Sequence, residues 1–439
     1  MLKTFKQGGI HPPENKLTCT KPIRSLPIPQ TVYVPIAQHI GIPSEIVVEV
    51  KQKVEAGQMI AKSGGYVSSS IHSPVAGTVT KLDKIIDSSG YKKQCIVIRS
   101  DAAEIADRAE LPLKTEIEMD AEAILNQINS CGIVGLGGAT FPSFVKLHVD
   151  PKSKIDTLLI NGVECEPYLT ADHSLMLAKA PEIVVGIHIL LKALGIQKAI
   201  IGIEANKQDA IQKFLDICKG NQQIQVAALK VKYPQGGEKQ LIKALLNREV
   251  PKGGLPHQVG VIVHNVGTIF AIYEAVQHHK PLTDRVVTVT GKKVKDPGNF
   301  WVKIGTPIKD LIDAVGGMPT DTRKILNGGP MMGKALKNLD VPVTKGTSGI
   351  VIISDTEAER ETAMSCIKCA RCISVCPMGL EPYLLMDLVE KNRPQITFDN
   401  DVMTCIECGS CSYICPSHRP LLDYIRYGKD LVKKLELKS

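Results

Sequence analysis

Aromatic residues are scarce in this chain, where they make up 4% of 439 residues and include a single tryptophan. Proteins that bind single-stranded nucleic acid stack the bases on aromatic side chains, so this scarcity argues against such a surface. Long runs of like charge are also missing, and a net charge of +8 is mild for this length. We therefore expect no nucleic-acid partner and a core packed mainly from aliphatic side chains.

Long apolar runs are missing as well. A membrane-spanning helix needs about 20 mostly apolar residues, and the two most apolar runs, 183–196 and 259–276, contain Lys192 and Glu274. The opening residues 1–13 are polar and include two prolines, unlike a secretory signal. We expect a protein that is not exported and whose membrane association comes only through a partner.

Cysteines are present in number, and their distribution is uneven. Eight of the thirteen fall between residues 366 and 415. In a protein without a secretory signal, such clustering indicates cofactor ligation and not disulfides. The other five are isolated and are most simply small core residues: Cys19, Cys95, Cys131, Cys165 and Cys218.

The clustered cysteines form two copies of the spacing C-x₂-C-x₂-C-x₃-C-P, separated by a segment that we predict to be helical. In two-cluster ferredoxins the fourth cysteine of each copy ligates the other [4Fe–4S] cluster. A pair of Cys₄ zinc sites is the alternative, although zinc modules usually pair two distant C-x₂-C knuckles and need no following proline. The expected ligands are Cys366, Cys369, Cys372 and Cys415 for one cluster, and Cys405, Cys408, Cys411 and Cys376 for the other.

Residues 31–100 alternate β-branched residues with turns and contain two similar pieces, at 46–62 and 71–82. This pattern is typical of a barrel-sandwich domain of the lipoyl or biotinyl type. The tip between the two halves reads SGGYVSS and lacks the lysine of a carrier domain. We therefore expect a structural domain here and not a swinging-arm carrier.

The rest of the chain predicts an α/β domain followed by a smaller β-rich unit. Apolar strands at 156–162, 198–205 and 259–267 alternate with amphipathic helices, which predicts a largely parallel sheet. Residues 286–335 predict a compact β-rich unit with one short helix, ended by Gly316-Gly317. After Ile353 the text SDTEAERETAMS predicts the start of a charged helix before the cysteine-rich tail.

The most conspicuous segment of the α/β domain is CGIVGLGGATFPSFVKL, residues 131–147. Gly135, Gly137 and Gly138 allow the backbone to approach a phosphate or a planar ring, and Lys146 follows where a helix could present its ammonium to a phosphate. The segment is not the G-x-G-x-x-G dinucleotide fingerprint, and glycine clusters alone are often only turns.

Together with NGVECEP (161–167), YPQGGEKQL (233–241) and HNVGTIF (264–270), this segment resembles the flavin- and NADH-binding subunit of respiratory complex I. The opening FKQGGIHPP, the barrel placed first and the two terminal cluster motifs resemble, over nearly the whole chain, the C subunit of the Rnf electron transport complex. The resemblance implies a multidomain α/β protein with four parts: an N-terminal segment and barrel-sandwich (lipoyl-like) domain at 1–110, a Rossmann-like FMN/NADH-binding domain at 111–283, a β-grasp (SLBB-like) domain at 284–354, and an α-helical two-[4Fe–4S] ferredoxin-like domain at 355–439.

The resemblance also implies which residues bind FMN and NAD(H). No side chain is expected to act as a catalytic acid or base. Judged from the residues alone, an acidic loop is usually a solvated face, and Phe141 could equally belong to the core. The implied FMN residues are Gly135, Gly137, Gly138, Lys146, Asn161, Asn265 and Thr268, and the implied nucleotide contacts are Phe141, Glu164, Glu166 and Glu238.

Three positions depart from the pattern of the related proteins. Thr140 stands where a small residue is usual, and Val163 and Gly237 stand where the complex I relatives have acids. We expect Thr140 to tighten the pocket slightly and one acid near the flavin to be missing.

NADH gives up two electrons as a hydride and an iron–sulfur cluster accepts one, so a flavin is expected between them. The resemblance implies a peripheral subunit of a membrane-bound, ion-translocating ferredoxin:NAD⁺ oxidoreductase, on the cytoplasmic face of the cell membrane. The implied partners are NAD(H), integral membrane subunits, a ferredoxin-type iron–sulfur subunit and, indirectly, ferredoxin. Two alternatives remain open: a soluble reductase of the cobalamin (corrin) reductase type, and a ferredoxin-like adapter that has lost its flavin.

Overall fold

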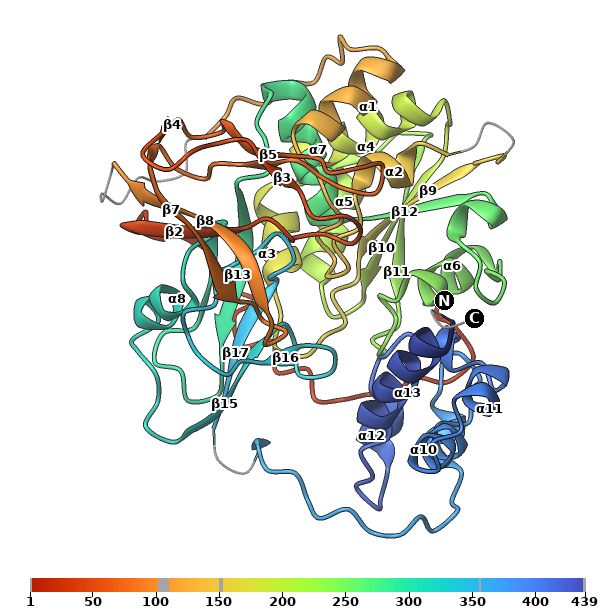
Figure 1. The fold of residues 1–439 in the computed structure, drawn as a ribbon. Coiled ribbons are helices and arrows are strands. Elements are labelled where there is room, and N and C mark those ends of the chain that lie inside the picture. Colours follow the sequence, from red (N-terminus) through yellow and green to blue (C-terminus); the bar gives the residue numbers. More distant parts are fainter. Residues whose placement is uncertain (1, 102–109, 150–152, 355–356, 437–439) are drawn as a thin grey trace.

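The computed structural model describes residues 2–101, 110–149, 153–354 and 357–436. Four units follow one another along the chain in Figure 1: a barrel (red to orange), an α/β unit (yellow to green), a mixed sheet (teal to cyan) and a helical unit (blue). The multidomain α/β architecture expected from the sequence is therefore confirmed. The domain boundaries themselves stay predictions.

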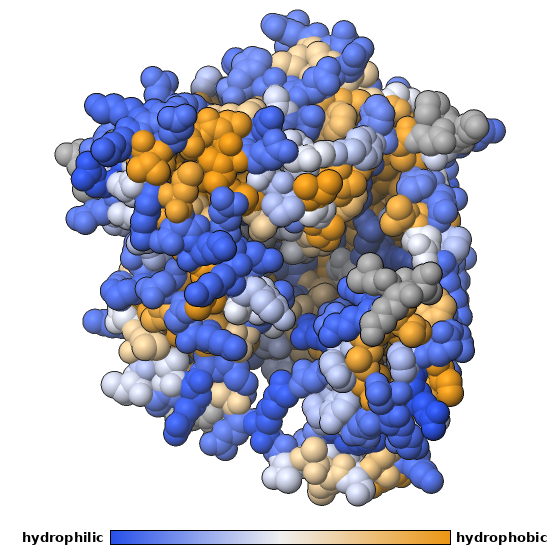
Figure 2. Space-filling model, in the orientation of Figure 1, coloured by the Kyte–Doolittle hydropathy of each residue, from blue (hydrophilic) through white to orange (hydrophobic). Residues whose placement is uncertain are grey.

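The barrel consists of two small sheets around an aliphatic core that includes Val32, Ile60 and Ile98. Several apolar side chains on its outside, among them Ile42 and Val47, are exposed, and Figure 2 shows apolar surface over this part of the molecule. One sheet has the order β2 (Thr31–Pro35), β8 (Lys92–Ser100), β7 (Gly77–Ile86), β4 (Lys53–Val54), and the other β3 (Glu45–Ile46), β5 (Met59–Lys62), β6 (Ile71–His72).

The α/β unit has a parallel sheet in the order β11 (Ile224–Leu229), β10 (Ala199–Glu204), β9 (Thr157–Gly162), β12 (Val261–Asn265). From β9 the chain moves outward to β10 and β11, and then returns to the other side of β9 as β12. This reversal creates a topological switch point between β9 and β12, and doubly wound sheets bind ligands at the carboxyl ends of the strands at that point.

Helices cover both faces of this sheet (Figure 1). Two of them, α4 and α7, touch closely because Gly186 of α4 has no side chain: a Cβ there would lie 2.6 Å from the Ile269 carbonyl oxygen of α7. The helices are α1 (Ala121–Ser130), α2 (Ser143–Leu147), α3 (Ala171–Ala178), α4 (Ala180–Leu194), α5 (Gln208–Ile217), α6 (Glu238–Leu246), η1 (Pro256–Val259) and α7 (Val266–His278).

The mixed sheet has the order β1 (Ile23–Ser25), β14 (Gly298–Lys303), β13 (Asp284–Thr290), β17 (Gly349–Ser354), β15 (Thr322–Asn327), β16 (Lys334–Ala335). Its one α-helix in the described residues, α8 (Ile308–Ala314), ends before Gly316 and Gly317, which both have positive φ, as the sequence predicts. Strand β1 was not predicted. It comes from the N-terminal segment and pairs in parallel with β14.

The helical unit packs α10 and α11 against the long helix α13, around the buried Leu385, Val402 and Ile425. The segment between the cysteine motifs was predicted to be helical, and the structure divides it into two α-helices and a 3₁₀ turn. The elements are α9 (Arg371–Ser374), α10 (Pro382–Glu390), α11 (Pro394–Asp399), η3 (Val402–Thr404), α12 (Ser410–Ile414) and α13 (Leu421–Glu436).

The prediction of a charged helix after Ile353 is wrong. Ser354 completes β17, residues 355–356 lie outside the described residues, and residues 357–370 form no α-helix. Nearly all side chains from 357 to 370 are exposed. A helix of this length needs an apolar face to bury, and the large apolar side chains of this segment, Met364 and Ile367, are exposed.

Among the described residues, no single helix combines the length and apolar composition of a membrane span. Helices α3 and α4 meet that criterion only when they are counted together, and they bend by 92° at their junction.

Candidate functional site

The glycine loop, residues 135–140, lies at the switch point of the parallel sheet. Its Leu136 N–H donates to Thr268 Oγ1 at 2.8 Å, which ties the loop to the first turn of α7. Gly137 and Gly138 are exposed. Gly138 has φ +110°, and no described atom lies within 4 Å of the place where its Cβ would stand. The loop therefore offers bare backbone at the carboxyl edge of the sheet.

Thr140, one of the three departures, closes this loop in a left-handed conformation with φ +52°. Its carbonyl oxygen accepts from Ile40 N of the barrel at 3.4 Å, and its methyl group lies against Gly346, where a Cβ would be 2.8 Å away. Three units therefore meet at this residue. That it tightens a ligand pocket stays a prediction.

Packing opposes an acid at the other two departures to different degrees. Val163 is fully buried at the end of β9, where a carboxylate would lose its water. Gly237 precedes α6, and a Cβ there would lie 2.5 Å from Gln240 Oε1. Burial therefore disfavours an acid at position 163, whereas a side chain at the half-buried position 237 would have to displace the end of Gln240.

Lys146 and Glu238 form an ion pair across the site. Lys146 lies on the short helix α2, Glu238 is the first residue of α6, and Nζ is 2.5 Å from Oε1. Both side chains are partly exposed, so the pair is accessible from solvent. A phosphate group arriving here would compete with Glu238 for the ammonium of Lys146.

His264, at the end of β12, adds a buried nitrogen beside this pair. Burial, together with the positive charge of Lys146, lowers the pKa of His264 to about 3, so the ring is neutral at physiological pH. Its Nε2 has no hydrogen-bond partner among the described residues. Buried polar atoms are almost always paired, so this nitrogen fits a site that takes up a polar ligand.

Asn161 and Asn265 end two neighbouring strands in register, β9 and β12. Asn161 Nδ2 donates to Gly236 O at 2.8 Å, and Asn265 Nδ2 donates to Asp172 Oδ2 at 2.7 Å. Asn265 Oδ1 also accepts from Gly267 N and caps α7. These amides hold the surrounding loops in place around the switch point.

Glu164 and Glu166 have other structural partners. The carboxylate of Glu164 accepts from the N–H groups of Asp172 and His173 at the start of α3. Glu166 accepts from Met331 N at 3.1 Å and Met332 N at 2.8 Å, and burial raises its pKa to about 7. The carboxylate of Glu166 therefore faces the mixed sheet, and a nucleotide contact for either acid stays a prediction.

The structure thus brings most of the predicted flavin residues to one end of the sheet. Phe141 is half-buried, and its carbonyl oxygen accepts from Gly135 N at 2.9 Å, which closes the glycine loop. The residues that gather at the switch point are Gly135, Gly137, Gly138, Phe141, Lys146, Asn161, Glu238, Asn265 and Thr268.

A buried charged group behind the glycine loop was missed from the sequence. Lys345 Nζ donates to Gly132 O at 2.7 Å and to Ser70 O of the barrel at 2.8 Å. Arg285 donates to the carbonyl oxygens of Lys345 and Leu136. Basic side chains from the mixed sheet therefore hold the backbone just before the loop, at Gly132, and within its first turn, at Leu136. No motif marks these residues, because only the tertiary fold buries them.

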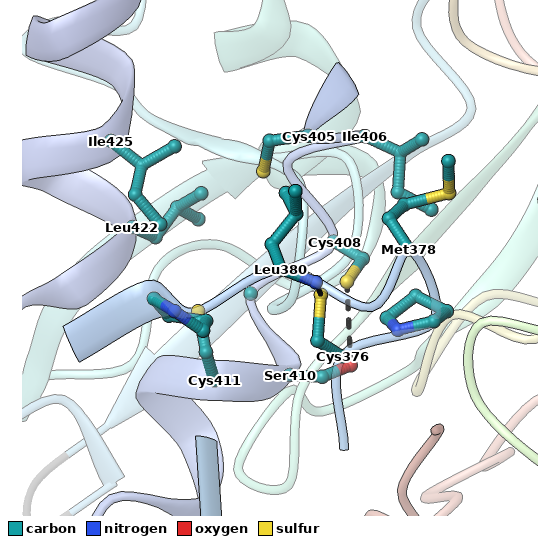
Figure 3. Close-up of a pocket in the computed structure, with 13 residues that line it drawn as sticks. Cys376, Met378, Leu380, Cys405, Ile406, Cys408, Ser410, Cys411, Leu422 and Ile425 are labelled. Atoms are coloured by element: carbon teal, nitrogen blue, oxygen red, sulfur yellow. Dashed lines mark hydrogen bonds between the residues drawn. The ribbon is translucent and has the colours of Figure 1, made fainter. Parts of the chain in front are cut away.

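The cysteine motifs are brought together across the two copies. Figure 3 shows Cys376 of the first copy lining one pocket with Cys405, Cys408 and Cys411 of the second. Backbone N–H groups of Leu380 and Glu407 donate to the sulfurs of Cys376 and Cys405, both at 3.3 Å. These four sulfurs belong to the set expected for one cluster, and the N–H···S bonds are of the kind that tune cluster potentials.

The cysteines of the other expected set are less buried. Cys372 is buried, and burial and the nearby Cys415 raise its pKa. Cys366 and Cys369 are exposed. Over the described part of the chain, no three His, Cys, Asp or Glu side chains converge to hold a single metal ion.

The backbone of the first motif nevertheless matches that of the second. Lys368 and Glu407, each just before the second cysteine of its motif, both have φ +56°. Ala370 and Gly409, each just after it, have φ +58° and +75°. Positive φ is uncommon outside glycine, so the shared pattern indicates that both loops adopt one cluster-binding conformation.

Segment 233–241 connects the two sites. Its Glu238 pairs with Lys146 of the glycine loop region, and its Tyr233 hydroxyl donates to Cys408 O at 2.8 Å. Gln240 Nε2 reaches Pro377 O and Met378 Sδ at 3.5 and 3.3 Å. The motif identified Glu238 but contained no sign that Tyr233 and Gln240 contact the cysteine region.

Family models match all four units. They are the RnfC barrel sandwich hybrid domain at residues 3–103, the Nuo51 FMN-binding domain at 128–274, the SLBB domain at 286–335 and the 4Fe-4S dicluster domain at 365–418. The chain therefore has a flavin-binding domain and a domain for two [4Fe–4S] clusters, as the sequence predicts.

Curated relatives match over nearly the whole chain. The C subunit of the proton-translocating ferredoxin:NAD(+) oxidoreductase complex of Clostridium ljungdahlii is 44% identical, over 98% of this chain and 94% of that protein. The C subunit of the Na(+)-translocating complex of Acetobacterium woodii is 42% identical, over 97% and 96%.

Among solved structures, an NAD⁺-reducing [NiFe]-hydrogenase in the H₂-reduced state matches with a TM-score of 0.49 and 18% identity, covering 72% of this chain and 62% of that one. With relatives more than 40% identical over almost its full length, the chain belongs to the RnfC family, the C subunits of the ion-translocating ferredoxin:NAD(+) oxidoreductase, or Rnf, complexes.

Proposed function

We propose that this chain exchanges hydride with NAD(H) through bound FMN and passes single electrons through two [4Fe–4S] clusters, as the peripheral subunit of a membrane-bound, ion-translocating ferredoxin:NAD⁺ oxidoreductase. The observation that carries this proposal is segment 233–241, which contacts the glycine-loop site through Glu238 and the cysteine pocket through Tyr233. Electrons can pass between a flavin at the glycine-loop site and a cluster at the cysteine pocket only if the two sites lie close together. Two sites with unrelated roles would not need a shared segment.

The residues at the switch point fit a flavin phosphate and ring. Gly138 leaves bare backbone there, Lys146 supplies a positive charge, and His264 has a buried nitrogen without a described partner. Bound FMN and [4Fe–4S] clusters supply the conversion between hydride transfer and single-electron transfer. The side chains bind and orient, which is the main contribution that a protein makes to hydride transfer.

The cysteine pocket fits one [4Fe–4S] cluster. Its four thiols lie among apolar side chains, and burial raises the pKa of Cys405 to about 11. The Cys405 thiol must lose its proton to ligate a metal centre, so metal binding there releases a proton. The ligand sets proposed from the motifs are therefore Cys376 with Cys405, Cys408 and Cys411, and Cys415 with Cys366, Cys369 and Cys372.

The partners and location are proposed from the family. The names of the relatives describe subunits of proton- or Na(+)-translocating ferredoxin:NAD(+) oxidoreductase complexes. We place the chain at the cytoplasmic face of the cell membrane, bound to integral membrane subunits and to a ferredoxin-type iron–sulfur subunit that leads to ferredoxin. Co-purification of those membrane subunits with a tagged chain tests this placement, and a chain that purifies alone under mild solubilisation contradicts it.

The flavin assignment is tested with Lys146→Met. The variant removes the charge that we assign to the FMN phosphate, and charged hydrogen bonds contribute about 1.5 to 3 kcal/mol, so the FMN dissociation constant should rise roughly 10- to 100-fold. Flavin fluorescence titration measures it. Lys239→Met is the matched control, because Lys239 lies next to Glu238 on α6 but bonds to Pro251 O. Wild-type protein that is brown from clusters yet releases no flavin on denaturation would instead support the adapter alternative.

A further inference from the structure

Residues 3–10, which we call the strap, run between the α/β unit and the helical unit. In Figure 1 the strap is the red segment next to the blue helices, and the chain continues from it toward the mixed sheet. The strap is distant in sequence from both of its neighbours. It includes the double glycine of the opening FKQGGIHPP.

The strap is fastened to the α/β unit at both ends. Lys3 pairs with the edge of β11: its N–H donates to Ala228 O at 3.2 Å, and Lys230 N donates to Lys3 O at 2.9 Å. Ile10 exchanges two backbone hydrogen bonds with Tyr233, at 2.8 and 2.9 Å. Between these points Phe5 is only 2% exposed.

The middle of the strap contacts the helical unit at a predicted cluster ligand. Gly9 N donates to Val375 O at 2.8 Å. Gly8 lies so close to Cys376 that a Cβ on Gly8 would stand 2.5 Å from the Cys376 carbonyl carbon. Gly8 also has φ +69°. Both the conformation and the space therefore require glycine at this position.

Tyr233 is shared by the strap and the cysteine pocket. Its backbone pairs with Ile10, and its hydroxyl donates to Cys408 O at 2.8 Å. Ile10, Tyr233 and Cys408 are buried in one apolar cluster. The strap therefore holds the tyrosine that connects segment 233–241 to a second predicted cluster ligand.

The covalent connection between the units does not provide this alignment. Residues 357–370 lead from the mixed sheet into the helical unit, and nearly all of them are exposed and without regular structure. Polar contacts outside the strap include Gln240 with Pro377 and an exposed ion pair between Lys252 and Asp401. Exposed ion pairs contribute little to stability, so the strap is well placed to determine the docking.

We propose that the strap positions the helical unit against segment 233–241, and that Gly8 is its critical positioning residue. This inference rests on the proposed function, in which one electron leaves the reduced flavin and reduces one cluster. The strap exchanges no atoms, protons or electrons in that step. It determines how close the cysteine pocket lies to segment 233–241.

The test compares Gly8→Ala with Gly195→Ala in the holoprotein. Gly195, at the end of α4, has φ +64°, and no described atom lies within 4 Å of its Cβ position, so the control carries similar backbone strain without the clash. We expect faster hydrogen exchange in peptides covering 228–236 and 372–380 of Gly8→Ala, and no change in the control. Iron and flavin contents should match wild type in both variants.

Kinetics supply a readout that a general loss of stability would not give. After mixing with NADH, the flavin of Gly8→Ala should be reduced at the wild-type rate, while cluster reduction slows about tenfold or more, since small displacements have large kinetic effects. Unchanged exchange and unchanged cluster reduction would overturn the strap proposal.

A second pair of variants covers the case in which Gly8→Ala does not fold. Ile10→Ala removes apolar contact with Tyr233 without creating a clash, and it should loosen the same peptides, while Ile10→Val should restore their protection. If Ile10→Ala and Ile10→Val show equal protection from hydrogen exchange in these peptides, the proposal is contradicted. If NADH fails to reduce the wild-type flavin, the proposed function is wrong, and the exchange experiment still decides whether the strap docks the helical unit.

Discussion

Cys376 shows at the scale of one residue how the two motifs depend on each other. It belongs by sequence to the first motif, yet it lines the pocket of Cys405, Cys408 and Cys411 (Figure 3). The N–H of Leu380 donates to its sulfur. Its side chain therefore connects the first loop to the second site.

Cys376→Ser should remove the cluster of the second motif and spare that of the first. We expect about half of the iron to be lost, with NADH reduction of the flavin retained. The double variant Cys376→Ser/Cys411→Ser should lose no more iron than either single variant, whereas Cys376→Ser/Cys366→Ser should lose nearly all of it. Iron analysis and electron paramagnetic resonance measure this.

Cys218→Ser is the control for this experiment, since Cys218 is buried beside α5, away from both motifs. The opposite result would mean that each motif binds its own cluster. In that case the iron losses would add in Cys376→Ser/Cys411→Ser, and Cys376→Ser/Cys366→Ser would lose no more iron than either single variant.

The residues of the site could be predicted to different degrees. Glycines and Lys146 follow from the local motif, because backbone shape and charge are local properties. The partners of Glu164 and Glu166 could not be predicted, since they belong to α3 and to residues 331–332. Arg285 could not be predicted for the same reason, because its role depends on burial behind a loop that is distant in sequence.

At the scale of one element, strand β6 makes the stability of the barrel depend on pH. His72 on this strand is buried, and burial, followed by the charge of Lys345, lowers its pKa to about 3 from 6.5. Between these values the unfolded chain binds more protons than the folded one. The contribution of neutral His72 to the free energy of unfolding is therefore fully present above pH 6.5, and it is lost as the pH falls from 6.5 toward 3.

Lowering the pH from 7 to 5 should cost the barrel about 2 kcal/mol through His72. His72→Gln should remove most of this dependence, because glutamine does not titrate. Pulse proteolysis in urea at the two pH values measures the barrel's unfolding free energy. If wild type and His72→Gln lose the same stability over this pH range, the assignment to His72 is wrong.

Elements with strong periodicity were predictable and short edge elements were not. The apolar strands β9, β10 and β12 were predicted within a residue or two. Strand β11, with an alternating and partly exposed pattern, was missed. So was β1, whose three half-buried residues become a strand only because β14 lies beside them. Their structure is determined by partners that the local sequence does not contain.

At the scale of the whole molecule, Lys345 joins three units. It lies after β16 of the mixed sheet, and its ammonium donates to Ser70 O of the barrel and Gly132 O before the glycine loop. It is 1% exposed, and burial lowers its pKa to about 7. The carbonyl groups that it satisfies are buried with it.

Lys345→Met should loosen the barrel from the α/β unit, because a buried carbonyl that loses its donor costs about 1 to 3 kcal/mol. We expect faster hydrogen exchange in peptides covering 68–72 and 130–136, and weaker FMN retention as the loop loses an anchor. Lys334→Met, on the exposed strand β16, is the control. Unchanged exchange at 130–136 would show that Arg285 and Thr268 suffice to hold the loop.

The strap has a consequence for the order in which the molecule is made. Gly9 bonds to Val375, so 375 − 9 = 366 positions separate the two partners. At synthesis rates of about 5 to 20 residues per second, the ribosome needs roughly 20 to 70 s to cover that separation. Throughout this time Ile10 lacks Cys408, one of the residues with which it is buried. The strap can pair with the α/β unit once residues 228–233 have been made. Its contact with the helical unit is a late event in biogenesis, because it requires that the cysteine-rich region has been synthesised and folded.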